Sequence, residues 1–255
     1  MKKGLKARLA AGETLYGMFV MLPSPAVVEM VGYAGFDYVI LDAEHGAAGT
    51  EMLENQLRAA DAAGIAALVR ICGQTPAEVL HALDAGACGI VVPHVLDAAQ
   101  ARELVAAAHY PPRGRRGLAG TARAGRHGMT SLSEHLDTAL SEILVVPQIE
   151  DATAVGQAGA IAAVDGVDAV FVGPADLSLS MGHPGNPAHP EVVGAIDGIV
   201  TDVQAQGRVA STFARTEPEA QELVGRGFKM ICFSTTAVFS QRLLAMAKEL
   251  KAAAR

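Results

Sequence analysis

The sequence of 255 residues contains few cysteines and few aromatic residues, and each scarcity excludes a class of protein. The three cysteines, Cys72, Cys88 and Cys232, lie far apart without C-x-x-C spacing, which argues against a disulfide framework and a structural zinc site. Tryptophan is absent and aromatic residues amount to 4%, so small aliphatic side chains must fill the core. No apolar run reaches the ~18 residues of a membrane span. The basic N-terminus also lacks the apolar stretch of a signal peptide, and we expect a soluble, cytoplasmic protein.

The charge balance is acidic, with 20 Lys and Arg residues against 27 Asp and Glu residues and a formal net charge of -7. Such a chain has no basic field for a nucleic acid or an anionic membrane, so neither is expected as a partner. The lysines are Lys2, Lys3, Lys6, Lys229, Lys248 and Lys251. Because none lies between positions 6 and 229 and Lys229 begins a predicted strand, a Schiff-base mechanism and pyridoxal phosphate attachment are disfavoured. Carbonyl chemistry would then need a metal ion as Lewis acid.

Short runs rich in Val, Ile and Leu alternate along the chain with longer Ala- and Leu-rich segments of helical period. We expect strands at Leu15–Val20, Asp37–Asp42, Ala66–Arg70, Cys88–Pro93, Ile143–Glu150, Asp168–Gly173, Arg208–Phe213 and Phe228–Ser234. We expect helices at 25–34, 50–63, 76–84, 97–108, 131–140, 151–163, 189–206, 217–226 and 236–252.

These strand–helix units predict an α/β fold of the (β/α)8 or TIM-barrel type, formed by a single domain over residues 1–255. Several strands are almost continuously apolar, which is typical of parallel strands covered on both faces. A barrel needs ~250 residues, and the chain has that length. A doubly wound open sheet is the alternative, but it often carries a G-x-G-x-x-G turn, and the sequence has none.

The interval between Pro93 and Ile143 is too long for one strand–helix unit. It contains an arginine-rich stretch with Arg113, Arg115, Arg116, Arg123 and Arg126. This stretch is either a solvated surface loop, or a lid or subunit contact that carries cations towards an anionic substrate.

Active sites of such barrels lie where the strands end, so the polar residues after each strand are the candidates. These are Asp42, Glu44 and His45 after the second strand, Arg70 at the third, Gln148 and Glu150 at the fifth, and Gly173, Pro174, Ala175 and Asp176 after the sixth. Glu150 and Asp176 form a pair of carboxylates on neighbouring units, which suits a hard cation such as Mg2+ or Mn2+. The alternative is that each carboxylate caps a helix.

Arg70 and His45 each have a structural and a functional interpretation. A buried Arg70 needs an anionic partner, which is either a structural carboxylate, Asp42 or Glu44, or a substrate oxyanion. His45 is either a general acid/base, its natural role near neutral pH, or a loop histidine without a catalytic role.

Six segments carry a more specific pattern: LDAEHG, the Arg70 strand, LDAGACGIVVPHV, YPPRGRRG, VPQIE, and VFVGPADLS followed by MGHPGNPAHPEV. In this order they resemble the HpcH/HpaI family of metal-dependent, class II 2-oxo acid aldolases, from about residue 5 to residue 248. They are most similar to the 4-hydroxy-2-oxoheptanedioate and 2-dehydro-3-deoxyglucarate aldolases within that family.

The resemblance implies a (β/α)8 barrel that holds Mg2+, Mn2+ or Co2+ through Glu150 and Asp176. It implies reversible cleavage of a 4-hydroxy-2-oxo acid to pyruvate, or hydroxypyruvate, and an aldehyde, with His45 as acid/base and Arg70 beside the enolate oxygen. Asp42 and Asp84 both match acidic positions that would orient His45, and the sequence does not choose between them.

The family resemblance also implies a homo-oligomer. Its members are usually hexamers in which the last helix packs on a neighbouring subunit. The segment 236–252 is amphipathic enough for such a swap, but it would equally suit packing within its own chain.

The chemistry of the implied reaction agrees with these residues. Cleaving a C–C bond next to a hydroxyl leaves an enolate, which a divalent cation and Arg70 would stabilise. The turn before LSLS opens a helix whose free N–H groups would hold a carboxylate, and Ala175 and Asp176 are the donors because Pro174 has no N–H. The expected substrate contacts are Arg70, Gln148, Gly173, Pro174, Ala175 and Asp176.

Three features depart from the family pattern and leave the aldehyde partner open. The eighth strand ends in Ser234, Thr235 and Thr236, the seventh ends in STFA, and the arginine-rich stretch has one Arg more than expected, which hints at an anionic or polyhydroxy acceptor. The alternatives are a 2-oxo acid decarboxylase or a phosphoenolpyruvate-type lyase with the same metal–enolate site, and a non-catalytic 2-oxo acid binding protein.

Overall fold

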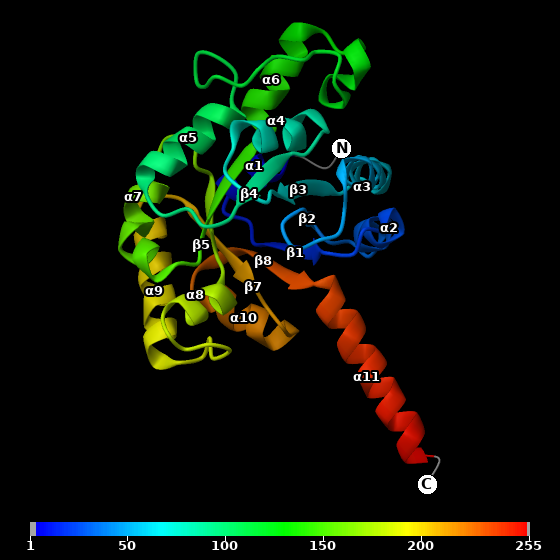
Figure 1. Cartoon of the computed structure of the whole chain (residues 1–255), viewed down its shortest axis with the longest axis vertical. Helices are drawn as coiled ribbons and strands as arrows, with labels where there is room; N and C mark the ends of the chain where they lie inside the picture. Colours follow the sequence, from blue (N-terminus) through cyan, green and yellow to red (C-terminus); the bar gives the residue numbers. More distant parts are fainter. Residues whose placement is uncertain (1–3, 254–255) are drawn as a thin grey trace.

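Eight parallel strands close into a barrel in the computed structural model, which describes residues 4–253 (Figure 1). The strands are β1 Leu15–Val20, β2 Tyr38–Asp42, β3 Ala66–Arg70, β4 Gly89–Val92, β5 Leu144–Ile149, β6 Ala169–Val172, β7 Val209–Phe213 and β8 Phe228–Ser234. Each strand pairs with the next in sequence, and β8 pairs back to β1. The predicted (β/α)8 barrel is confirmed and the open sheet is wrong. Lys2 and Lys3 lie outside the described residues.

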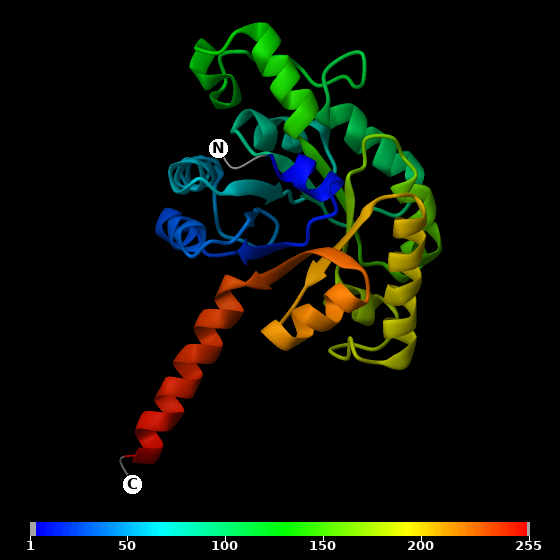
Figure 2. The same ribbon diagram turned by 180° about the vertical axis from the view of Figure 1, so that it is seen from behind.

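Helices surround the barrel (Figures 1 and 2). They are α1 Leu5–Ala10, α2 Pro25–Tyr33, α3 Thr50–Ala63, α4 Pro76–Asp84, α5 Ala98–Ala108, α6 Leu132–Glu142, α7 Ala158–Ala162, α8 Pro174–Ser180, α9 Pro190–Ala205, α10 Glu217–Gly225 and α11 Thr235–Ala253, with 3-10 segments η1 Arg123–Gly128 and η2 Ala152–Gln157. The predicted helix ranges do not include α1, η1 or α8, although the turn at residues 173–176 was expected to open a helix. The helix expected at 151–163 divides into η2 and α7, beside the helix-weakening Gly156.

The barrel strands bury both of their faces, which explains their continuous apolar runs. Phe19, Leu68 and Phe171 belong to a buried cluster formed by the inner faces of the strands. Val39 and Val69 belong to a second cluster, which includes residues of the surrounding helices. Polar side chains that are available for chemistry therefore lie where the strands end.

The arginine-rich stretch lies at the amino ends of the strands, because α5 returns the chain to that end before α6 leads into β5. The arginine partners are Asp165 for Arg113, Glu103 for Arg115, Asp84 for Arg116 and Asp61 for Arg123. Arg116 is buried, at 2.5 Å from Asp84 and with its guanidinium 4.8 Å from the Tyr110 ring centroid. These contacts hold the stretch against the amino-end face. Within one chain the stretch is therefore not a lid over the carboxyl rim, and the alternative of a subunit contact stays open.

The last helix, α11, projects away from the barrel (Figures 1 and 2). Of its residues only Thr235 is buried, and its Oγ1 donates to the Phe19 carbonyl at 3.0 Å. Large apolar side chains along α11 are exposed: Val238, Phe239, Leu243, Leu244, Met246 and Leu250. Packing of this helix within its own chain, one of the two alternatives, is therefore wrong. Among the described residues, no helix combines the length and apolar character needed to span a membrane.

Candidate functional site

Asp42 and Arg70 form a buried ion pair at the carboxyl ends of β2 and β3, where the sheet register places them opposite each other. Arg70 Nε donates to Asp42 Oδ1 at 2.9 Å, and Arg70 Nη2 donates to Asp42 Oδ2 at 2.8 Å. This two-bond geometry fixes both side chains. Asp42 Oδ1 also accepts the backbone N–H groups of Glu44 and His45, at 3.1 and 3.3 Å. Asp42 therefore orients Arg70 and shapes the turn that carries His45.

The Arg70 guanidinium lies among carboxylates and above an aromatic ring. Its Nη1 is 3.1 Å from Glu44 Oε2, and its Cζ is 4.7 Å from the centroid of the Phe19 ring. Burial opposes the charge of Arg70, but the hydrogen bonds and charges of Asp42 and Glu44 outweigh burial and raise its pKa. The hydrogen bonds to Asp42 use two of the five N–H donors of the guanidinium, and Nη1 forms an ion pair with Glu44. N–H donors therefore remain for a substrate oxygen.

His45 and Asp84 lie at opposite ends of the barrel. His45 is exposed in the turn after the carboxyl end of β2. Asp84 ends α4, which leads into the amino end of β4, and it is paired with Arg116. Within one chain Asp84 therefore does not orient His45. Asp42 is the carboxylate connected to His45, through the backbone N–H rather than the ring.

Glu150 follows β5 and is buried, with its side chain 2% exposed. Its Oε1 accepts the His94 backbone N–H at 3.0 Å, and its Oε2 accepts a hydrogen bond from the Gln148 amide. Burial raises the pKa of Glu150 above its ordinary value, contacts with His94 oppose this shift, and the charge of Asp176 adds to it. The negative charge of Asp176 thus acts on the buried carboxylate of Glu150. A cation between the two carboxylates would offset both the burial of the Glu150 charge and the repulsion by Asp176.

Asp176 is exposed in the first turn of α8, directly after β6. The residue that caps α8 is Gly173, and Glu150 is held by His94 and Gln148, so neither carboxylate is a helix cap. A Cβ at position 173 would lie 2.8 Å from Glu150 Oε2 and 3.1 Å from Gln148 Nε2. Only glycine therefore leaves Glu150 its position.

The polar atoms around Glu150 fit a divalent cation. The charge of Asp176 acts on the buried Glu150 carboxylate, and the buried Gln148 Oε1 lacks a hydrogen-bond partner among the described residues. Hard cations such as Mg2+ and Mn2+ prefer oxygen ligands of this kind. The residues of this chain are thus consistent with the oxygen-rich site expected from the sequence.

The side chain of His94, which the sequence did not predict as a site residue, lies at the same rim. His94 Nδ1 is 3.0 Å from Asp151 Oδ2 and 3.5 Å from Glu150 Oε1, and its Nε2 is 3.9 Å from Glu44 Oε1. The hydrogen bond with Asp151 raises the pKa of His94, burial opposes this shift, and the surrounding carboxylates add to it. A signal for His94 is present in the sequence, because it follows the apolar strand GIVV and Pro93, and residues that follow the strands of such barrels form the active site.

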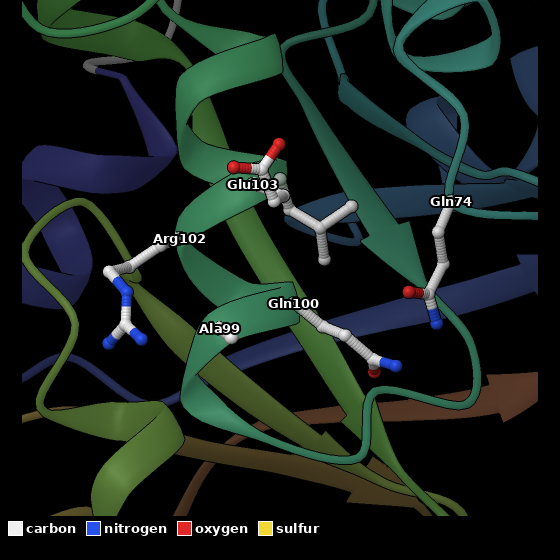
Figure 3. A pocket seen from close by; sticks show the side chains of 6 residues that line it. Gln74, Ala99, Gln100, Arg102 and Glu103 are labelled. Atoms are coloured by element: carbon white, nitrogen blue, oxygen red, sulfur yellow. The ribbon is translucent and has the colours of Figure 1, made fainter.

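Two other features of the surface do not form the site. A hollow lined by Gln74, Ala99, Gln100, Arg102, Glu103 and Leu104 lies along α5 (Figure 3). His183, His189 and Glu191 gather after α8, but the two imidazole rings are stacked with centroids 3.5 Å apart and planes 13° apart. Their lone pairs therefore lie in two nearly parallel planes and do not point at one ion. Lys229 lies at the other end of the barrel, with Nζ 3.5 Å from Thr14 Oγ1.

The comparison with protein families agrees with this geometry. Residues 15–239 match the family model described as HpcH/HpaI aldolase/citrate lyase. The match includes β1 to β8 and every residue named above at the carboxyl rim.

Individual relatives cover most of the chain. A hydroxypyruvate/pyruvate aldolase from Pseudomonas aeruginosa is 40% identical over 223 residues, which are 87% of this chain and 82% of that protein. A 4-hydroxy-2-oxo-heptane-1,7-dioate aldolase from Salmonella paratyphi C is 35% identical over 89% of this chain and 86% of that protein. The crystal structure of an HpcH/HpaI family protein from Burkholderia cenocepacia superposes with a TM-score of 0.92 at 33% identity, covering 97% of this chain and 98% of that one.

Proposed function

The chain belongs to the HpcH/HpaI aldolase/citrate lyase family, and we propose on this premise that it reversibly cleaves a 4-hydroxy-2-oxo acid to pyruvate, or hydroxypyruvate, and an aldehyde. One observation carries the proposal. The buried Asp42–Arg70 ion pair lies at the carboxyl ends of β2 and β3, at the same rim as the carboxylates that follow β5 and β6, Glu150 and Asp176. A cation site and a fixed guanidinium beside it suit a reaction that develops negative charge on one oxygen.

Glu150 and Asp176 would hold a divalent cation, Mg2+, Mn2+ or Co2+, which when bound supplies Lewis acidity towards the keto oxygen and the enolate. Arg70 would direct N–H donors that are not bonded to Asp42 to the same oxygen, and Asp42 keeps the guanidinium from turning away. Gln148 and the backbone N–H groups of Ala175 and Asp176 would hold the substrate carboxylate. The small Gly173, Pro174 and Ala175 leave room for it.

His45 would move the proton. In the cleavage direction it accepts the proton of the C4 hydroxyl, the C3–C4 bond breaks, and its electron pair becomes the enolate. The C4 carbon leaves as the aldehyde carbonyl, and protonation of the enolate at C3 gives pyruvate. The exposed position of the His45 ring suits contact with a substrate arriving from solvent. Within the described chain, Lys229 is at the opposite end of the barrel and does not offer an amine to this reaction.

We also propose that the protein works as a homo-oligomer, with the exposed apolar face of α11 packed on a second copy. The support is the resemblance to a hexameric family and the row of exposed Leu, Met and Phe side chains on a helix that leaves its own barrel. Contiguous apolar patches of this kind mark protein contacts.

The decisive experiment measures pyruvate release from 4-hydroxy-2-oxo acids with and without EDTA. Turnover should disappear after chelation and return with Mg2+, Mn2+ or Co2+, and the metal that restores it best identifies the cofactor. Undiminished turnover after complete metal removal would refute the mechanism. Oxaloacetate decarboxylation faster than aldol cleavage would favour the decarboxylase alternative, and substrate binding without turnover would favour the binding protein.

A variant of Arg70 tests the role of the guanidinium separately from metal binding by Glu150 and Asp176. Arg70→Ala should lower aldol cleavage by about 10²–10³-fold, as expected for loss of a charge-stabilising donor, while Mn2+ binding survives. Arg115→Ala is the matched control, because Arg115 is half-exposed and contacts Glu103 on α5. Near wild-type turnover in Arg70→Ala would contradict the enolate role.

A further inference from the structure

The turn after β4 contains a strained residue. His94 has φ of +54°, in the left-handed region that residues other than glycine rarely adopt. This conformation lets successive N–H groups reach β5 and Glu150: the His94 N–H donates to Glu150 Oε1 at 3.0 Å, and the Val95 N–H donates to the Gln148 carbonyl at 3.1 Å. Strain of this kind persists only where surrounding contacts hold it.

Gln74 adds two contacts to those that hold the turn. Its Nε2 donates to the carbonyl of Pro93 at 3.0 Å and to the carbonyl of His94 at 2.8 Å, so it binds both sides of the strained residue. Gln74 is itself fixed, because the next residue, Thr75, is the N-cap of α4 in a reciprocal capping box with Glu78. A rigid helix start is thus connected to the β4 turn by one amide.

We propose that Gln74 is a positioning residue whose amide holds the left-handed turn at His94 and thereby sets the hydrogen bond from the His94 N–H to Glu150. Its effect on a bound cation rests on the proposed function of Glu150 as a ligand. Residues outside the ligand shell that orient a ligand in this way commonly influence metal affinity by about 10–100-fold.

The chain supplies a matched control at Gln100. Figure 3 shows the Gln74 and Gln100 side chains on the same hollow, the first from a loop and the second from α5. Gln100 also contacts the backbone after β4, since its Oε1 accepts the Leu96 N–H at 2.7 Å. It does not bond Pro93 or His94. Gln100→Met therefore removes a hydrogen bond to the same loop without touching the turn.

The first experiment needs no metal. Hydrogen exchange of metal-free protein, read at single residues by fragmentation mass spectrometry, follows the His94 and Val95 amides. Gln74→Met, which keeps the length of the side chain but not its donors, should speed their exchange by about tenfold. Gln100→Met should leave both amides unchanged. Unchanged exchange at His94 in Gln74→Met overturns the proposal.

The second experiment measures Mn2+ affinity by electron paramagnetic resonance of the free ion. Gln74→Met should weaken binding by about tenfold, and Gln100→Met should not. The test is repeated in a His94→Gly background, where glycine adopts positive φ without strain. There Gln74→Met should cost about twofold or less, because the turn no longer needs the amide.

The outcomes distinguish the two proposals. An equal loss of Mn2+ affinity from Gln74→Met with His94 and in the His94→Gly background overturns the positioning role. If Glu150→Gln binds Mn2+ as tightly as the wild type, the proposed function of Glu150 is wrong. Hydrogen exchange at His94 then decides the role of Gln74 by itself.

Discussion

Replacing Asp42 by Asn tests whether the ion pair with Arg70 organises the rim. Asp42 is buried, receives two hydrogen bonds from Arg70, and accepts the N–H groups of Glu44 and His45. Asn keeps an oxygen for the two backbone donors but removes the negative charge. The variant therefore leaves the Arg70 charge buried with only Glu44 as a close partner, at 3.1 Å.

The magnitude follows from these contacts. Removing one partner of a buried ion pair costs about 3–5 kcal/mol, and the remaining Glu44 places Asp42→Asn near the lower value, at about 3 kcal/mol. Asp42→Ala also loses the two backbone hydrogen bonds, at about 1 kcal/mol each, and should cost about 5 kcal/mol. Turnover should fall in both variants, because the guanidinium is no longer aimed.

Urea unfolding at one protein concentration measures the free energy. Glu54→Gln is the control, since its exposed pair with Arg58 should be worth about 0.5 kcal/mol or less. The double variant Asp42→Asn/Arg70→Met should be less destabilised than the sum of the single variants by about 2–3 kcal/mol. Additive losses, or an Asp42→Asn variant as stable as the control, would refute the reasoning.

Three further predictions concern the rim, the amino-end face and the last helix. Gly173→Ala should weaken Mn2+ binding by about tenfold with little change in stability, because the added Cβ meets Glu150. Gly156→Ala is the control, since open space surrounds that position, and it should bind Mn2+ normally. Equal Mn2+ affinities of the two variants would show that Gly173 is not needed to place Glu150. Burial and neighbouring cations lower the pKa of His109 to about 4. As the pH falls from 6.5 to 4, the unfolded chain therefore binds a proton at His109 that the folded protein does not bind, and the free energy of unfolding should fall by about 2 kcal/mol. His109→Phe should lose this part of the pH dependence in urea titrations, and an identical profile would contradict it. Removing residues 241–255 should reduce the mass measured by light scattering to that of a smaller assembly, and an unchanged mass would exclude α11 as the contact.

The fold could be predicted from the sequence because its information is local. Each barrel strand is an apolar run bounded by helix ends and glycines, and the structure shifts no predicted strand end by more than one residue. Arg70 and Glu150 could be placed on one rim for the same reason, since parallel strands in a barrel end together.

The features of the site that the sequence does not predict depend on contacts between distant segments of the chain. The pairing of Asp42 with Arg70 needs the β2–β3 register, and the importance of His94 needs a backbone turn that no propensity indicates. The end of the barrel at which Asp84 lies has a related explanation. An acidic residue near a motif says nothing about which end of the barrel it reaches, and here a helix end and Arg116 decide this.

The closure of the barrel has a consequence for how the protein acquires activity as it folds. β1 and β8 join residues about 215 positions apart, whereas the rim residues named here lie on β2 to β6 and the turns that follow them. Closing so long a loop is entropically costly and is expected late. Glu150 and Asp176 would then come together on an open, curved sheet. Arg70 would contact the Phe19 ring only after β1 has joined the sheet. During refolding, Mn2+ binding would precede the recovery of turnover. The interval between the two events would measure how long the pairing of β1 with β8 takes.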